Sequence, residues 1–127
     1  MNFKKIFITG GAGYAGSCLV PELLKKGYEV TVYDIMYYTD KYLPKNNSKL
    51  NIVKGDIRDS NKIYETSKDH DVFVHLACIS NDTSFALDEK LSTSINLDAF
   101  RPLVEISKNS NVKRFFYASS YSVYSRK

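Results

Sequence analysis

The sequence predicts an α/β domain built on a doubly wound parallel sheet. Short runs of β-branched and aromatic residues alternate along the chain with segments that have the apolar spacing of helices. Strands that alternate with helices pair in parallel through right-handed crossovers, and the helices then cover both faces of the sheet. The length of 127 residues, with 43% hydrophobic and 25% charged residues, fits one globular domain.

The first elements predict a strand, a helix and a second strand in that order. Residues 3–9 form a short apolar run that stops at a glycine-rich turn. Residues 14–26 have helical spacing, and Gly27 supplies the stop signal. Residues 29–33 predict the second strand, which ends at Asp34. Together these elements make a βαβ unit.

The middle of the chain predicts a loop, a third strand and a second helix. The stretch 40–49 is polar and contains proline and asparagine, which is typical of a loop. Residues 51–54 predict a shorter strand. Asp59 or Ser60 can cap a helix that runs to about Lys68, because both side chains accept hydrogen bonds from first-turn N–H groups.

The remaining predicted elements are a strand at 71–77, a long helix at 88–109 and a strand at 114–118. The strand at 71–77 is almost continuously apolar, as expected for a strand that is buried on both faces. Five strands of this kind fit one half to two thirds of a Rossmann fold, most simply in the order 3-2-1-4-5.

The strongest functional signal is the glycine-rich turn at residues 9–16 (TGGAGYAG). It can be read as G-x-G-x-x-G or as G-x-x-G-x-x-G. It also lies between a predicted strand and a predicted helix, which is the context that the dinucleotide-binding motif requires. No Gly-Lys-Ser/Thr follows, which argues against a P-loop. A glycine-rich turn that binds no ligand is the structural alternative.

Physical chemistry explains why glycine suits this turn. Early glycines accept backbone angles that a Cβ forbids, a middle glycine lets the main chain approach a diphosphate, and a glycine one turn into the helix allows close packing on the sheet. The unpaired N–H groups and the dipole of the helix N-terminus favour a negatively charged diphosphate. We therefore predict that residues of this turn bind a dinucleotide cofactor. They are Gly10, Gly13, Tyr14, Ala15 and Gly16.

Asp34 predicts which dinucleotide is preferred. It ends the second strand, 18 residues beyond Gly16, where a carboxylate accepts hydrogen bonds from the ribose hydroxyls of adenosine. The same carboxylate would repel a 2′-phosphate, and no arginine lies near it in the sequence to reverse this preference. The expected cofactor is therefore NAD rather than NADP. The alternative is that Asp34 only caps a local turn or is merely exposed.

Four further features follow the glycine-rich turn and Asp34 in order along the chain. They are GDIRD at 55–59, HLA at 75–77, Asn96, and SSYSVY at 119–124. The ordered set resembles the extended short-chain dehydrogenase/reductases, specifically the NAD-dependent nucleotide-sugar epimerases and dehydratases, and the resemblance covers residues 4–124. It implies transient hydride transfer between a sugar and NAD, with a nucleotide sugar as the substrate of the full-length family.

The resemblance also implies how the rest of the cofactor is held. The Asp56 carboxylate would take the exocyclic amine of adenine, and the backbone N–H of Ile57 would reach a ring nitrogen. Leu76, Ala77 and Cys78 would lie along the phosphates and ribose of the cofactor, where small side chains leave room. Read from the residues alone, the structural alternative for Gly55-Asp56 is a turn after the third strand.

For the catalytic centre, the resemblance points to Ser120 as the active-site Ser/Thr and to Asn96 as a neighbour of the active site. Ser119 would support Ser120 and line the nicotinamide side. A solvated helix asparagine and ordinary serines at the end of a strand are the structural alternatives. We interpret His75, which belongs to a buried strand, as a core histidine rather than a catalytic base.

The family's catalytic Tyr-x-x-x-Lys pair does not occur after Ser120 in this sequence. Tyr37 stands four residues before Lys41, but it lies in the loop after the second strand, and we interpret that spacing as coincidence. We therefore expect residues 1–127 to be an incomplete NAD(P)-binding Rossmann domain without the substrate-binding part. Such a chain would bind NAD but lack turnover of its own. The alternative is a non-catalytic dinucleotide-binding sensor.

Composition excludes several other functions. The net charge of +4 comes from dispersed lysines rather than a basic face, so we expect no nucleic-acid partner. Two distant cysteines predict neither a disulfide framework nor a metal site. We expect no signal peptide, and the sequence has no stretch of about 18 apolar residues, so we expect a cytoplasmic protein without a membrane partner. A homodimer is expected from the family, although the oligomeric state stays open.

Overall fold

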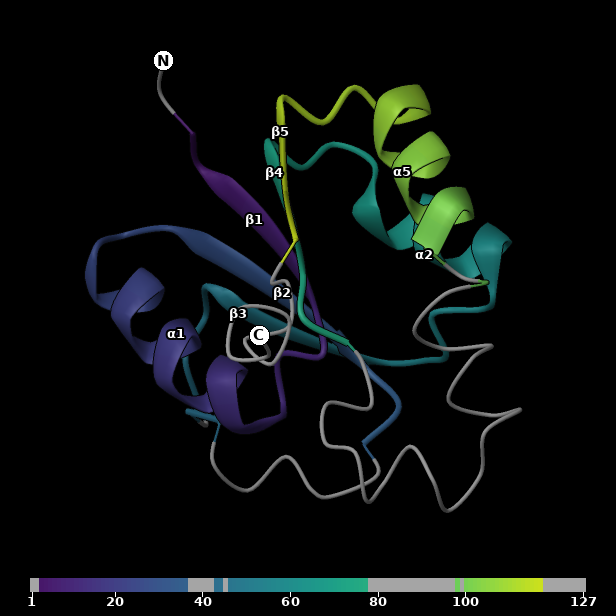
Figure 1. Cartoon of the computed structure of the whole chain (residues 1–127). Coiled ribbons are helices and arrows are strands. Elements are labelled where there is room, and N and C mark those ends of the chain that lie inside the picture. The colour runs from purple at the N-terminus through teal and green to yellow at the C-terminus, as the bar shows by residue number, and fades with distance from the viewer. Residues whose placement is uncertain (1–2, 37–42, 45, 78–97, 99, 118–127) are drawn as a thin grey trace, which may run out of the picture.

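A computed structural model describes residues 3–36, 43–44, 46–77, 98 and 100–117 of the chain. Its centre is a five-stranded parallel sheet in the order β3-β2-β1-β4-β5 (Figure 1). The strands are β1 (Lys5–Thr9), β2 (Glu29–Asp34), β3 (Leu50–Lys54), β4 (Val72–His75) and β5 (Arg114–Tyr117). The structure thus confirms the predicted fold class and strand order.

Three helices pack on this sheet within the described ranges. They are α1 (Tyr14–Lys25), α2 (Ser60–Ser67) and α5 (Phe100–Asn109). The predicted stop of α1 is confirmed, because Gly27 has a φ of +93° and its N–H donates to the carbonyl of Leu24. The long helix expected at 88–109 is described only in its last part, since residues 78–97 and 99 lie outside the described residues. None of these helices is long and apolar enough to cross a membrane.

The cap of α2 shows which of the two candidate residues starts the helix. Asp59 is the N-cap, and its carboxylate accepts a hydrogen bond of 3.2 Å from the backbone N–H of Lys62. Ser60 is instead the first residue of the helix. The short polar side chain at 59 therefore satisfies one of the N–H groups that every helix start leaves without a partner.

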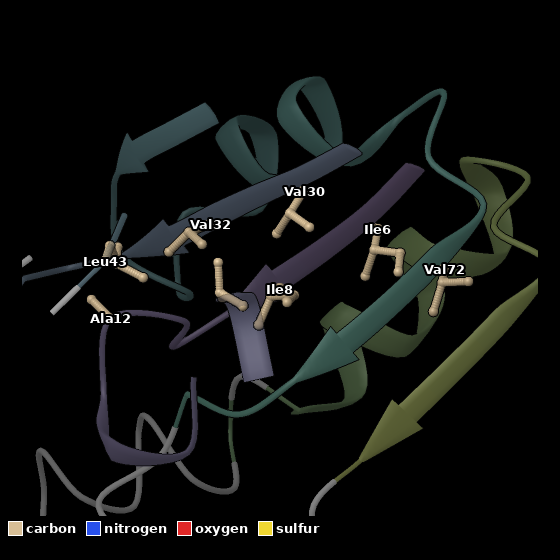
Figure 2. Close-up of a cluster of buried hydrophobic side chains, with 8 residues drawn as sticks. Ile6, Ile8, Ala12, Val30, Val32, Leu43 and Val72 are labelled. Carbon is tan, nitrogen blue, oxygen red and sulfur yellow. The ribbon is translucent and has the colours of Figure 1, made fainter. Parts of the chain in front are cut away.

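The sheet separates two buried clusters of different chemistry. One face carries an aliphatic cluster against α1, which includes Ile6, Ile8 and Val20 (Figure 2). The other face carries a cluster that includes Phe7, Phe73 and, from α2 and α5, Ile63 and Leu103. Successive residues of β1 therefore point to opposite faces, as the period of a strand requires.

Asp71 joins the beginnings of three strands at the amino end of the sheet. Its Oδ2 accepts the backbone N–H groups of Lys4 and Lys5 at 2.7 and 3.0 Å. Its Oδ1 accepts Nζ of Lys113 at 3.3 Å. These hydrogen bonds, above all the one from Lys4, lower the pKa of the Asp71 carboxyl to about 2.

We expect Asp71→Asn to lower the free energy of unfolding by about 1 kcal/mol at neutral pH. This value is near the low end of the range for hydrogen bonds to charged groups, because the carboxylate lies near solvent. The pKa of Asp71 is lower in the folded state, so its contribution is complete above the ordinary value of 3.8 and is lost as the pH falls toward about 2. Urea unfolding of both proteins at several pH values measures this difference. The difference should shrink below about pH 4, in line with the pKa shift.

Asp69→Asn is the matched control, because Asp69 is exposed and lies two residues away. It should unfold like the original protein at every pH. Equal stability of Asp71→Asn and the original protein at neutral pH would contradict the assigned role of Asp71.

Candidate functional site

The candidate site lies at the edge of the sheet where its strands end. The parallel register pairs Thr9 with Tyr33 on one side and with His75 on the other. It also pairs Asp34 with Lys54. The loops that leave these strands therefore start side by side, at the edge where doubly wound sheets bind their ligands.

The glycine-rich turn leads from β1 into α1. Gly10 has a φ of +74°, in the left-handed region that favours glycine, and its N–H donates to the carbonyl of Tyr33 at 2.8 Å. Gly13 is the N-cap of α1 and has no side-chain cap, and the first turn carries no acidic residue. The N–H groups of the first turn therefore have no carboxylate competing for them, and the helix dipole adds a positive potential there.

Asp34 is held by the loops around it. Its Oδ2 accepts the backbone N–H of Ala12 at 3.0 Å, and its Oδ1 accepts that of Met36 at 2.8 Å. Asp34 therefore caps backbone N–H groups of both loops. An ionised carboxylate has about four acceptor positions, so these two bonds leave about two positions for further donors.

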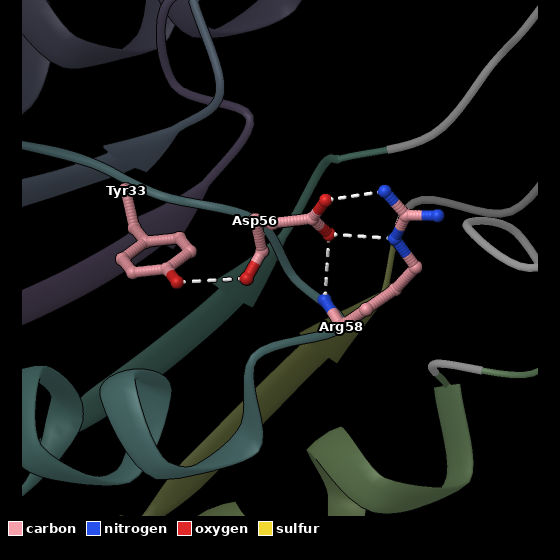
Figure 3. A network of polar contacts seen from close by, with 3 residues as sticks. All are labelled: Tyr33, Asp56 and Arg58. Carbon is pink, nitrogen blue, oxygen red and sulfur yellow. Dashed lines mark hydrogen bonds and ion pairs between the residues drawn. The ribbon is translucent and has the colours of Figure 1, made fainter.

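The loop after β3 contains Asp56 and Ile57, the residues that the resemblance assigns to adenine. The carbonyl of Asp56 accepts the Tyr33 hydroxyl at 2.7 Å and the N–H of Asp59 at 3.0 Å. Its carboxylate accepts the backbone N–H and Nε of Arg58, both at 2.9 Å, and pairs with Nη2 as well (Figure 3). The side-chain hydrogen bond from Arg58 is the main cause that lowers the pKa of Asp56. The loop is thus also the local turn that the residues alone predicted.

At the end of β4, the chain runs close to the glycine-rich turn. The N–H of Leu76 donates to the carbonyl of Thr9 at 2.9 Å, and that of Ala77 lies 3.4 Å from Thr9 Oγ1. His75 is 2% exposed, and its Nδ1 shares a hydrogen bond of 2.7 Å with Thr9 Oγ1. Burial lowers the pKa of His75 to about 4, so the ring is neutral at physiological pH. The burial of the ring and its hydrogen bond to Thr9 confirm that His75 belongs to the core.

Three contacts of this edge were missed by the sequence analysis. They are the Tyr33 hydroxyl on Asp56, the Arg58 guanidinium on the Asp56 carboxylate, and the Thr9–His75 pair. An arginine two residues after an aspartate is a signal that could have suggested the second contact. The other two join residues that are distant in sequence, and no local pattern reports them.

Several predicted site residues lie outside the described residues. They are Cys78, Asn96, Ser119 and Ser120. The described part of the predicted site is therefore its cofactor side, and the catalytic side stays a prediction.

Comparison with known proteins supports the same interpretation. A model of the NAD dependent epimerase/dehydratase family matches residues 6–127. A UDP-N-acetyl-alpha-D-glucosaminuronate decarboxylase from Bacillus cytotoxicus is 32% identical over 124 residues, which are 97% of this chain and 38% of that protein.

Two solved structures share the fold closely. A UDP-N-acetylglucosamine 4-epimerase from Methanobrevibacter ruminantium M1, in complex with UDP-N-acetylmuramic acid, has a TM-score of 0.87 at 30% identity over 98% of this chain. The dTDP-glucose 4,6-dehydratase DesIV from Streptomyces venezuelae, with NAD and TYD bound, has a TM-score of 0.81 at 28% identity over 87% of this chain. The chain spans only 40% and 38% of these two proteins. It belongs to the NAD-dependent epimerase/dehydratase family and corresponds to the N-terminal part of its full-length members.

Proposed function

We propose that this chain binds NAD at the carboxyl edge of its sheet and forms the cofactor part of a nucleotide-sugar epimerase or dehydratase. Bound NAD would accept a hydride from the sugar and return it. Family membership and the arrangement of the described loops support the proposal. The sequence has no Tyr-x-x-x-Lys pair after Ser120, so we expect these 127 residues alone to bind the cofactor without turning over a nucleotide sugar.

The observation that carries the proposal is the space around Gly13. A Cβ at Gly10 would lie 2.6 Å from the backbone of Ala77, and a Cβ at Gly16 would lie 2.2 Å from the carbonyl oxygen of Gly11. The fold itself therefore requires glycine at 10 and 16. At Gly13 the nearest atom of the described residues, the carbonyl oxygen of Gly10, would be 3.4 Å away, which is ordinary contact, and the φ of −80° suits any residue. Close approach of a diphosphate gives a reason for glycine at a position where packing among the described residues gives none.

Each end of the cofactor then has residues assigned to it. The N–H groups at the start of α1, next to Gly13, would bind the diphosphate. The acceptor positions left on Asp34 would take the adenosine ribose hydroxyls. The remaining assignments follow the family resemblance. Asp56 and Ile57 would hold adenine, Leu76, Ala77 and Cys78 would lie along the phosphates and ribose, Ser119 would line the nicotinamide side, and Ser120 and Asn96 would face the sugar.

The role of Gly13 can be tested with Gly13→Ala. A methyl group here should leave the midpoint of thermal unfolding almost unchanged, because the fold has room for it. It should weaken NAD binding by about tenfold or more, since it would stand between the main chain and the diphosphate, and tenfold corresponds to about 1.4 kcal/mol. Isothermal calorimetry gives the dissociation constant, and circular dichroism gives the unfolding midpoint.

Gly16→Ala provides the contrast, because its Cβ would collide with backbone. It should lower the unfolding midpoint itself, through overpacking of about 1–3 kcal/mol. An NAD affinity of Gly13→Ala equal to that of the original protein would contradict the proposal that the diphosphate lies against Gly13.

The preference for NAD over NADP depends on the charge of Asp34. Asp34→Asn keeps one acceptor oxygen and removes the charge that repels a 2′-phosphate, so the ratio of NAD to NADP affinity should fall by about tenfold. Calorimetric titrations of both dinucleotides measure the ratio. Asp69→Asn, at an exposed position beyond α2, should keep the original ratio. A ratio unchanged in Asp34→Asn would show that another group selects the cofactor.

A further inference from the structure

Tyr33 is a buried polar side chain that the proposed NAD site does not use directly. It is fully buried, and it is the largest of the described residues that are less than 2% exposed. Its ring packs against Phe7 with the two centroids 5.8 Å apart. Its hydroxyl leaves this cluster and donates to the carbonyl of Asp56 at 2.7 Å (Figure 3). A buried hydroxyl with one well-defined acceptor fixes the position of that acceptor.

The loop above Tyr33 is shaped to fit the ring. A Cβ at Gly55 would lie 2.4 Å from the Tyr33 hydroxyl oxygen and 2.5 Å from the ring carbon that bears it. Only glycine therefore lets the chain cross so close to the ring. The N–H of Gly55 also donates to the carbonyl of Asp34 at 2.9 Å. The start of this loop is thus fixed both by the backbone of β2 and by the Tyr33 side chain.

The same residue also contacts the glycine-rich turn. The backbone carbonyl of Tyr33 accepts the N–H of Gly10 at 2.8 Å, while its side chain holds Asp56. One residue of β2 therefore bonds to the turn proposed for the diphosphate and to the loop proposed for adenine. Its position sets the distance between the two.

The Tyr33 hydroxyl is a permanent donor. Burial, with smaller contributions from the charges of Asp59 and Asp56, raises its pKa to about 12. The group therefore stays protonated throughout the physiological range, and the bond to the Asp56 carbonyl does not depend on pH.

We propose that Tyr33 is a positioning residue that holds the loop at 55–59 in the conformation that recognises the edge of adenine. This inference rests on the proposed NAD site and adds to it a residue that touches no cofactor atom. Without the hydroxyl, the carbonyl of Asp56 keeps only the N–H of Asp59. The backbone that carries the Asp56 carboxylate and the Ile57 N–H, which must both meet the base, would then be held less firmly, with Arg58 still bonded to the carboxylate.

The test compares NAD with nicotinamide hypoxanthine dinucleotide in the original protein and in Tyr33→Phe. Hypoxanthine has an oxo group in place of the amine and a protonated ring nitrogen, so it offers neither group that the loop should bind. The original protein should prefer NAD, and Tyr33→Phe should reduce this preference by about threefold to tenfold, as expected for the loss of one buried hydrogen bond. Calorimetry on one sample of each protein gives both dissociation constants. An unfolded fraction lowers both apparent affinities alike, so their ratio reports only recognition of the base.

Tyr28→Phe is the matched control. It removes the same hydroxyl from a tyrosine before the opposite end of β2, where the side chain packs against the aliphatic cluster. The preference for NAD should be unchanged in this variant. If Tyr33→Phe does not fold, Gly55→Ala perturbs the same contact from the loop side and should reduce the preference in the same way.

Each outcome separates this inference from the proposal on which it rests. A protein that binds no NAD overturns both. A protein that binds NAD and the hypoxanthine analogue equally keeps the NAD site but overturns the adenine assignment and, with it, the role of Tyr33. A preference that survives in Tyr33→Phe, or in Gly55→Ala where that variant replaces it, overturns the positioning role alone.

Discussion

The register between neighbouring parallel strands is the constraint on which the candidate site depends. Since Thr9 lies opposite both Tyr33 and His75, the chain leaves β1, β2 and β4 at the same level of the sheet. The backbone groups just beyond these strands then find partners in one another. Gly10 bonds to the carbonyl of Tyr33, and Leu76 bonds to that of Thr9. The hydrogen bonds of the sheet therefore continue into the loops at this edge. Buried backbone N–H and carbonyl groups are rarely left without a partner, so these bonds fix where the loops start.

The glycines of the glycine-rich turn differ in whether the packing of the turn requires them. Gly10 and Gly16 satisfy the packing of the chain against itself, because any side chain there would meet backbone atoms. A Cβ at Gly13 would meet no such obstacle among the residues that the structure describes. The motif thus contains two positions where the turn itself requires glycine and one position, at the start of α1, where the described residues would accept a Cβ. The donors at that start carry no acidic neighbour in the first turn, so the local potential favours an anion.

Much of the fold could be predicted from the sequence because strands buried on both faces leave a continuous apolar signature. The run at 71–77 is of this kind and corresponds to β4. The apolar residues at 14–26 follow instead the period of a helix, and they correspond to α1. The side-chain contacts could not be predicted in the same way. The bond from Tyr33 to Asp56 and the bonds from Lys4 and Lys5 to Asp71 span long stretches of chain, and they depend on side-chain direction rather than residue type. For Asn96, Ser119 and Ser120, the sequence remains the basis of the assignment.

The unequal chemistry of the two sheet faces also protects the alignment of the strand ends. Ile6 and Ile8 point to an aliphatic layer, whereas Phe7 points to a layer that contains Tyr33 and Phe73. A slip of one residue in β1 would push an aromatic ring among small aliphatic side chains and leave a void where the ring had been. Such a shift in register would therefore destabilise the packing on both faces of the sheet. The packing of the hydrophobic interior thereby keeps the ends of the strands aligned at the candidate site, to which both clusters extend through Ala12 and Ile57.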